Sequence, residues 1–283
     1  MALKKTLTLF FAGFFILTGC SDKSSYNPLR IKALRELVTY FKVYSAQDHN
    51  GPLLLKRIGR DYDGGYVVAE KSLRLADVLL GYGIADDISF EETFSNLYGK
   101  PSYGFDGGAQ EVKSKNKLFT FVRECIASDE FLYKGQNSSG KVSTFSQQVS
   151  KLGLKNKKIF IKMDIEGAEY EAFPDILRHH SKNVTGIVLE LHFKSLASIK
   201  KAIKLLSDIN EEFLLVHVHG NNAGGARFST QGVSGKIPYL IELTYINRNL
   251  ITGFEVLANQ KHPQAIDMIN VPSMPEAEFE IPI

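Results

Sequence analysis

The sequence is poor in cysteine and contains no tryptophan. The lack of tryptophan by itself excludes no class of protein. Cysteine occurs only at Cys20 and Cys125 among 283 residues, and no CxxC pair is present, which argues against a structural zinc site. If Cys20 belongs to a processed N-terminus, Cys125 alone remains, and an internal disulfide is excluded. Because Cys125 lies in an apolar run at 119–127, we expect a buried, unreactive thiol.

A strong charge bias and a dinucleotide-type glycine motif are also missing. The formal net charge is +3 at pH 7, so no charge excess indicates a nucleic-acid partner, and none is expected. No GxGxxG motif supports phosphate binding in the dinucleotide manner. With 44% hydrophobic and 23% charged residues, the composition is typical of a globular protein with a sizeable core.

The N-terminus has the features of an export signal. Lys4 and Lys5 precede an apolar run at 7–17 that is short for a membrane span but suits a signal peptide over residues 1–19. The residues Leu17-Thr18-Gly19-Cys20 resemble the lipobox of bacterial lipoproteins, which implies cleavage before Cys20 and acylation of its thiol. An uncleaved anchor and a chance cysteine are the alternatives. Ser21 after the cysteine favours the outer membrane of the cell envelope.

The rest of the chain is expected to form a tether with a helix, followed by one α/β domain. Residues 20–52 contain a polar tether and a helical pattern over 29–44, and the domain spans 53–283. From residue 77 onward, strand and helix patterns alternate, which indicates a mostly parallel sheet covered on both faces. The predicted strands are 78–83, 102–106, 119–127, 158–164, 186–192, 213–219 and 239–246, and the helices between them are 89–98, one after 106, 143–152, 168–179 and 196–209.

The two ends of this domain are also predicted. Only a loop rich in glycine, asparagine and serine separates the last two strands, so we expect them to pair antiparallel. At 63–65, Asp-Gly-Gly predicts a turn followed by a strand. The tail from His262 carries four prolines and is expected to be extended.

The most informative stretch is a pair of carboxylates after the fourth strand. Residues 158–162 read KIFIK, a short apolar run typical of a buried strand. Asp164 and Glu166 follow it, and Gly167 allows a tight exit into the next helix. In open α/β sheets, ligands bind outside the carboxyl ends of the strands, so both carboxylates are candidates for ligand chemistry. The alternative is that Asp164 merely caps the helix.

A second candidate site follows the first and second strands. The first strand ends in Gly81-Tyr82-Gly83, where glycines let the backbone approach a ligand closely. Asp106 ends the second strand, 23 residues after Gly83, and can accept both hydrogen bonds of a ribose diol. Ordinary turns would explain the glycines and Asp106 as well.

Polar residues also end the later strands. Glu190 and His192 are two residues apart and face the same side of their strand, and His217 and His219 do likewise. Asp164, His192 and His219 could then surround one cleft. A carboxylate with an imidazole could bind a divalent metal, with Asp164 and His219 as the predicted ligands. It could equally supply a general base, and a strand histidine is often only structural.

The strings around these residues resemble one family. The segment 162–173, KMDIEGAEYEAF, is similar to the DIEGAE region of FkbM-type S-adenosylmethionine-dependent methyltransferases. DGGYV, GYGIADDISFE, SYGFDG, LELHF and HVHGNN extend the resemblance over about residues 55 to 275. It implies the class I methyltransferase fold, an α/β, Rossmann-like domain with a seven-stranded, mostly parallel sheet and a C-terminal antiparallel hairpin.

The resemblance also implies a reaction and roles for the residues named above. S-adenosylmethionine would bind at Gly81-Tyr82-Gly83 and Asp106. The methyl group would pass to an oxygen of a small-molecule or glycan acceptor. Asp164 or His192 would accept the acceptor's proton, and Glu166 would help to position the loop.

Export conflicts with this cofactor, because a membrane-anchored lipoprotein lies outside the cytoplasm in which S-adenosylmethionine is made. The signal could remain uncleaved, or the cofactor could be available outside the cell. The third possibility is a catalytically inactive exported binding or envelope-associated module on a methyltransferase fold. A fold alone does not establish catalysis, so this module is the alternative function.

Overall fold

The computed structural model describes residues 27–128, 141–224, 227–231, 233–258 and 260–281. The predicted signal peptide and the lipidation site at Cys20 therefore lie outside the described residues.

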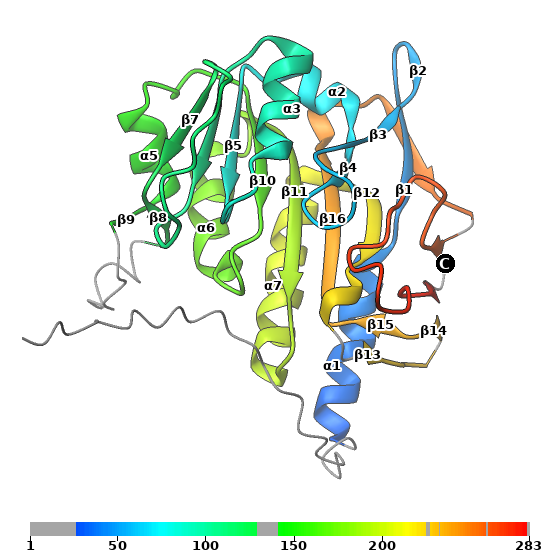
Figure 1. Ribbon diagram of the computed structural model, residues 1–283. Coiled ribbons are helices and arrows are strands. Elements are labelled where there is room, and N and C mark those ends of the chain that lie inside the picture. The colour runs from blue at the N-terminus through cyan, green and yellow to red at the C-terminus, as the bar shows by residue number, and fades with distance from the viewer. Residues whose placement is uncertain (1–26, 129–140, 225–226, 232, 259, 282–283) are drawn as a thin grey trace, which may run out of the picture.

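A seven-stranded sheet with the order β12-β16-β11-β10-β5-β6-β7 forms the centre of the molecule (Figure 1). Its strands are β5 (Val78–Tyr82), β6 (Ser102–Phe105), β7 (Phe119–Val122), β10 (Ile159–Met163), β11 (Val184–His192), β12 (Phe213–Gly220) and β16 (Leu240–Asn247). β16 runs antiparallel to both β11 and β12, and the neighbours from β11 to β7 are parallel. This is the strand order of the class I methyltransferase fold, so the predicted fold class is confirmed.

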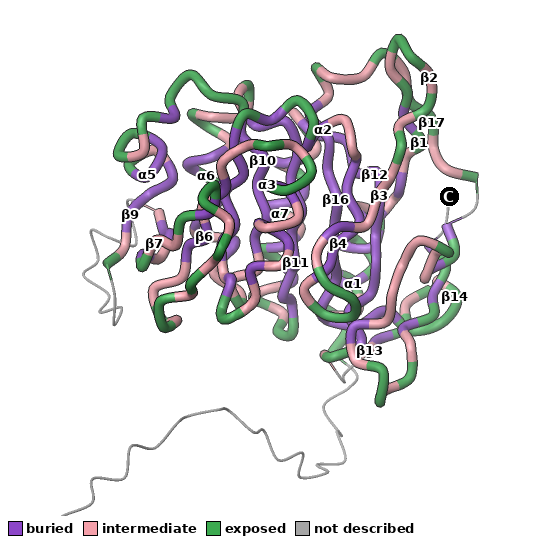
Figure 2. The backbone as a smooth tube through the Cα atoms, turned by 45° about the horizontal axis from the view of Figure 1, so that its top comes forward, coloured by how far each residue is buried: buried purple, intermediate pink, exposed green. Residues whose placement is uncertain are grey.

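Helices cover both faces of the sheet. One face carries α1 (Pro28–Val38), α5 (Phe145–Lys151), α6 (Glu169–His180) and α7 (Leu196–Glu212), and the other carries α2 (Glu70–Leu75), α3 (Ser89–Tyr98) and the hairpin of β3 (Leu55–Ile58) and β4 (Tyr66–Ala69). Alternate residues of a strand serve the two cores: Leu80 packs with the first group, and Leu79 with the second. Figure 2 shows the central strands buried along their length, as a sheet covered on both faces requires.

Short elements surround the sheet. β1 (Tyr44–Asp48) pairs with β2 (Gly51–Pro52) and β17 (Gly253–Val256), β8 (Cys125–Ile126) with β9 (Val142–Ser143), β13 (Arg227–Phe228) with β15 (Ile237–Pro238), and β19 (Phe279–Glu280) with β14 (Ser234–Gly235) and β18 (Lys261–His262). Three 3-10 turns, η1 (Thr39–Phe41), η2 (Asn222–Gly224) and η3 (Arg248–Leu250), complete the described chain.

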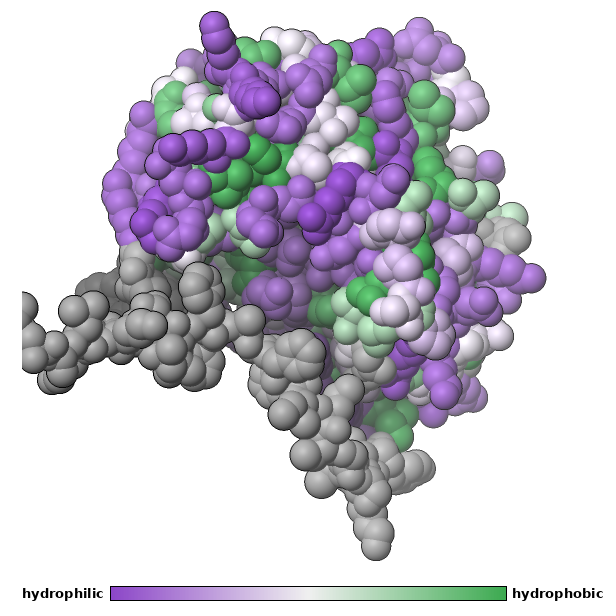
Figure 3. Space-filling model, in the orientation of Figure 1, coloured by the Kyte–Doolittle hydropathy of each residue, from purple (hydrophilic) through white to green (hydrophobic). Residues whose placement is uncertain are grey.

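The surface of the described chain is mostly hydrophilic on the face seen in Figure 3, where hydrophobic residues gather only in small patches. Among the described residues, no helix combines the length and the apolar character that crossing a membrane would require.

Four predicted elements differ from the structure. The strand predicted over 119–127 is interrupted, because β7 and β8 belong to different sheets. The helix predicted after Asp106 is absent, since residues 107–118 form turns and irregular structure. The N-terminal helix predicted to reach residue 44 stops earlier, and β1 follows it. The tail from His262 is not extended throughout, because turns interrupt it between the paired strands β18 and β19.

Candidate functional site

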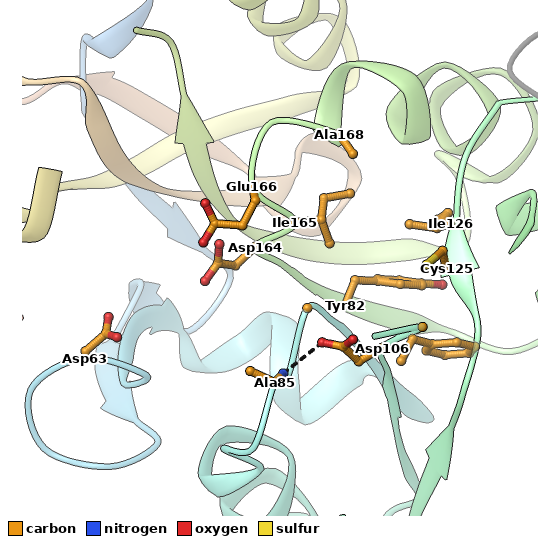
Figure 4. A pocket seen from close by; sticks show the side chains of 13 residues that line it. Asp63, Tyr82, Ala85, Asp106, Cys125, Ile126, Asp164, Ile165, Glu166 and Ala168 are labelled. Atoms are coloured by element: carbon orange, nitrogen blue, oxygen red, sulfur yellow. Dashed lines mark hydrogen bonds between the residues drawn. The ribbon is translucent and has the colours of Figure 1, made fainter. Parts of the chain in front are cut away.

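A cavity of about 430 Å³ lies at the carboxyl edge of the sheet. It is lined by the loops after β5, β6 and β10, by the start of α6 and by the turn between β3 and β4 (Figure 4). Of the predicted site residues, Tyr82, Gly83, Asp106, Asp164 and Glu166 are part of this lining. The volume falls within the usual range for small-molecule sites.

Asp106 lies on one side of the cavity and is held by backbone N–H groups. Its Oδ2 atom accepts a hydrogen bond of 3.0 Å from Ala85, and its Oδ1 accepts bonds of 2.8 Å from Gly108 and from Ala109. A carboxylate offers about four acceptor positions. Three of them therefore fix the side chain, and the fourth is available to a ligand.

The two predicted cofactor glycines have different roles. Gly83 has a φ of +73°, and a Cβ atom there would clash with the backbone oxygen of Asp164, so glycine is needed where the loops after β5 and β10 meet. Gly81 does not line the cavity. A Cβ atom at Gly81 would clash with the buried carboxyl group of Glu91, so this glycine makes room for a protein side chain instead of a ligand.

Tyr82, between these glycines, forms part of the apolar wall. Its ring stacks on Phe105 with centroids 4.8 Å apart, and its hydroxyl donates a 3.1 Å hydrogen bond to Gln148. Because both its ring and its hydroxyl already have partners, Tyr82 offers a ligand a surface and no polar atom.

Asp164 and Glu166 lie together on the other side of the cavity, with their carboxylates pointing the same way (Figure 4). Asp164 follows β10 directly; its Oδ2 accepts a 3.3 Å hydrogen bond from Tyr66, whereas its buried Oδ1 accepts none from the described residues. Glu166 has a φ of 56° and an 87% exposed side chain. A non-glycine residue in this conformation costs about 1–3 kcal/mol, and such strain is concentrated at functional sites.

Glu169, in the first turn of α6, organises this loop and the neighbouring histidine. The fully buried Oε1 atom accepts hydrogen bonds from the backbone of Ile165 at 3.2 Å and of Gly167 at 3.1 Å. The same oxygen lies 3.1 Å from Nδ1 of His192. Since this oxygen acts as an acceptor, Nδ1 is the donor in that contact, and the ring is fixed with Nε2 on the other side.

Nε2 of His192 faces three further carboxylates. It lies 3.4 Å from Glu166 Oε2, 3.6 Å from Glu190 Oε1 and 4.0 Å from Asp164 Oδ1. The structure thus brings together the three residues predicted to be catalytic, Asp164, Glu166 and His192, and adds Glu169 and Glu190 to them.

Burial and crowding shift the pKa values in this cluster. Burial opposes the charge of His192, but its contacts with Glu166 and Glu169 and the charge of Glu190 outweigh burial and raise the pKa of His192 to about 10. Burial raises the pKa of Asp164, and burial together with the charges of Asp164 and Glu242 raises the pKa of Glu190 well above its usual range. The contact with His192 lowers the pKa of Glu166. His192 is therefore protonated at neutral pH.

His219 lies away from this cluster, so the predicted pairing of Asp164 with His219 as metal ligands is not found. β16 and β11 separate its strand from β10, which puts the two backbones roughly 14 Å apart at about 4.8 Å per strand. Nδ1 of His219 instead lies 3.2 Å from Glu242 Oε2. Among the described residues, the group that places three potential metal-ligand atoms together is Asp164, Glu190 and His192.

Sequence reasoning missed Glu169 and did not place Glu190 in the site. An acid in the first turn of a helix is usually explained by its favourable interaction with the helix dipole. The sequence therefore offered no reason to assign Glu169, within the DIEGAE string, a role in the site. The expectation that Cys125 is buried was wrong: the thiol is only partly buried and lines the cavity beside Gly107. Burial raises the pKa of Cys125, so the protonated thiol predominates at neutral pH.

Comparisons with known proteins add little to this geometry. No protein-family model and no curated protein sequence matches the chain. A solved structure with some similarity is that of the plantazolicin methyltransferase BpumL in complex with a monoazolic desmethylPZN analog and SAH. The two chains are 13% identical, the match covers 63% of this chain and 82% of the other, and the TM-score is 0.30. The fold assignment therefore rests on the strand order of the sheet itself.

Proposed function

We propose that this protein transfers a methyl group from S-adenosylmethionine to an oxygen of a small-molecule or glycan acceptor. The observation that carries the proposal is the cavity at the carboxyl ends of β5, β6 and β10, in a sheet with the class I methyltransferase strand order. Ligands of open α/β sheets bind at this edge. The resemblance of the DIEGAE segment to FkbM-type enzymes supports the same reaction.

The lining of the cavity suits this cofactor. A ribose hydroxyl can donate to the remaining acceptor position of Asp106, and Gly83 allows close approach at the end of β5. The described residues that line it include four acids, Asp63, Asp106, Asp164 and Glu166, and no lysine or arginine. A cavity lined by one sign of charge favours ligands of the opposite sign, and the methyl-bearing sulfonium is a cation.

The acceptor would lie at the end of the cavity formed by Asp164 and Glu166. S-adenosylmethionine would supply an activated methyl group: the acceptor's oxygen would bond to the methyl carbon as the carbon–sulfur bond breaks, and S-adenosylhomocysteine would keep the electron pair. The protein aligns these atoms and removes the hydroxyl proton. Asp164 accepts that proton, because its Oδ1 has no hydrogen-bond partner among the described residues. His192, protonated at neutral pH, orients the carboxylates.

Titration calorimetry of the full chain with S-adenosylmethionine tests the cofactor assignment. Loss of a hydrogen bond to a charged group weakens binding by about 1.5–3 kcal/mol, so Asp106→Ala should lower the affinity about ten- to a hundredfold. Asp86→Ala is the matched control, because Asp86 is an exposed acid at the same edge that does not line this cavity. Thermal unfolding of each variant checks that the fold is kept.

Two outcomes would contradict the assignment. Equal affinity of wild type and Asp106→Ala would remove Asp106 from the cofactor site. No heat of binding to wild type at millimolar S-adenosylmethionine would favour the inactive exported binding module.

A further inference from the structure

We propose that Asp164, Glu190 and His192 form a binding site for one divalent cation beside the acceptor end of the cavity, which Asp164 lines and the other two residues adjoin from within the protein. Each residue offers one ligand atom, and these atoms all lie within 4.8 Å of one another. Asp164 directly follows β10, and the other two residues end β11, so two paired parallel strands set the spacing. Two carboxylates and one imidazole form a mixed oxygen and nitrogen set that suits Mn²⁺, and binding would release the proton from Nε2 of His192.

The environment of His192 is that of a metal ligand. Metal-binding histidines usually donate their other ring N–H to a carboxylate, which fixes the ring. Glu169 fills this role here: it is fully buried, and its Oε1 lies 3.1 Å from Nδ1 of His192. Nε2 thereby faces Glu166, Glu190 and Asp164, whose oxygens lie 3.4, 3.6 and 4.0 Å away. The distances to Glu190 and Asp164 are longer than ordinary hydrogen bonds.

The two carboxylates also have oxygens left over for a cation. Glu190 is only 5% exposed; Asn221 donates a 3.0 Å hydrogen bond to its Oε2, which leaves Oε1 facing His192. Oδ1 of Asp164 is buried and accepts no hydrogen bond from the described residues. Oxygens of this kind are normally hydrogen-bonded or bound to a metal.

The charge balance points the same way. Glu166 lies beside the cluster and adds a further negative charge. The neighbouring cation, Lys162, donates a 3.2 Å hydrogen bond from Nζ to the backbone oxygen of Gly83. Among the described residues, Lys162 forms no ion pair with Asp164 or Glu190, so its charge acts on them only at longer range and a divalent cation can fill the space between them.

This inference rests on the proposed function only for the role of the cation. Bound there, a divalent cation would supply Lewis acidity that lowers the pKa of an acceptor hydroxyl. Asp164 would hold the cation through Oδ1, and its Oδ2, which accepts one hydrogen bond from Tyr66, would remain to take the proton. Three protein ligands leave coordination positions open. The site would thus prefer an acceptor with two adjacent oxygens, such as a vicinal diol or an α-hydroxy acid.

Mn²⁺ titration of the full chain, followed by electron paramagnetic resonance without S-adenosylmethionine, tests the site. Wild type should bind one Mn²⁺ per chain. Glu190→Gln and His192→Ala should each weaken Mn²⁺ binding at least about tenfold, and Glu169→Gln, a change outside the ligand set, about 10–100-fold. Asp175→Asn is the matched control and should leave the affinity unchanged, because Asp175 is a buried carboxylate 3.9 Å from His179, outside the cluster.

Failure of the cation site and failure of the methyltransferase proposal are separable. Absence of stoichiometric Mn²⁺ binding by wild type overturns the site, whatever the variants do. The site is also overturned if Glu190→Gln and His192→Ala both bind Mn²⁺ with the affinity of wild type. Mn²⁺ binding by a protein without affinity for S-adenosylmethionine would leave the cation site standing and remove its catalytic role.

Discussion

Gly83 decides how closely the loops after β5 and β10 approach each other at the cavity. Its φ of +73° is in the left-handed region, and the backbone oxygen of Asp164 occupies the space that a Cβ atom would need. Gly99, at the end of α3, has a similar φ of +64°, but nothing lies within 4 Å of the place where its Cβ would be. An alanine at Gly99 would therefore introduce backbone strain alone, whereas an alanine at Gly83 would introduce the same strain and a clash with the Asp164 loop.

Gly83→Ala should destabilise the fold more than Gly99→Ala. The left-handed conformation costs both variants about 1–2 kcal/mol. The forced displacement of the Asp164 loop should add about 1–3 kcal/mol at Gly83 alone. Urea unfolding of both variants measures the difference. Equal losses of unfolding free energy would mean that the Asp164 loop moves aside at no cost and would contradict the prediction.

Single residues also show what the sequence could and could not predict. Asp164 and His192 were expected to converge because the carboxyl ends of parallel strands meet at one edge, and they do. The role of Glu169 depends on a loop with Glu166 at positive φ, which no residue pattern reveals. The glycine pattern predicted a cofactor role for Gly81. The sequence could not reveal that Glu91 packs against Gly81, because this contact depends on how α3 covers β5.

At the scale of elements, a buried polar row crosses the sheet. Glu242 on β16 is in register with Glu190 on β11 and with His219 on β12. The C-terminal tail covers this row: Asn270 donates a 2.7 Å hydrogen bond to Glu242, and Asp267 lies 3.0 Å from His217. The antiparallel β12–β16 pair was predictable from the missing helix between them, but strands as short as β18 and β19 carry too little pattern to predict.

His219 should make this row sensitive to alkaline pH. Burial opposes its charge, but Glu242 on β16, with Asp267 and Glu276 in the tail, outweighs burial and raises the pKa of His219 to about 9. The nearby His262 carries no opposing charge at neutral pH, because burial lowers its pKa to about 4. A raised pKa stabilises the folded state fully below about pH 6.5, and that stabilisation is lost as pH rises through about 9.

The destabilisation caused by His219→Gln should therefore depend on pH. It should be greatest below about pH 6.5 and shrink by up to roughly 3 kcal/mol on going above pH 9. Free energies of unfolding in urea, measured for both proteins across this range, provide the test. A pH-independent difference would show that folding leaves the pKa of His219 unchanged.

At the scale of the whole molecule, the alternation of strand and helix patterns predicted a mostly parallel sheet covered on both faces, and the resemblance implied the class I methyltransferase fold. The structure places a cavity at the carboxyl edge of this sheet, with Asp106 on one side and Asp164 on the other. Lipidation at Cys20 stays a prediction, since that residue lies outside the described chain. The central claim is that S-adenosylmethionine occupies this cavity.

Cys125 allows the most direct test of that claim, because its partly buried thiol lines the cavity. The full chain carrying Cys20→Ser leaves Cys125 as its one cysteine. Its alkylation by iodoacetamide in alkaline buffer, followed by mass spectrometry, should slow in proportion to occupancy as S-adenosylhomocysteine is added. An alkylation rate that stays unchanged at millimolar S-adenosylhomocysteine would contradict the assignment of this cavity to the cofactor.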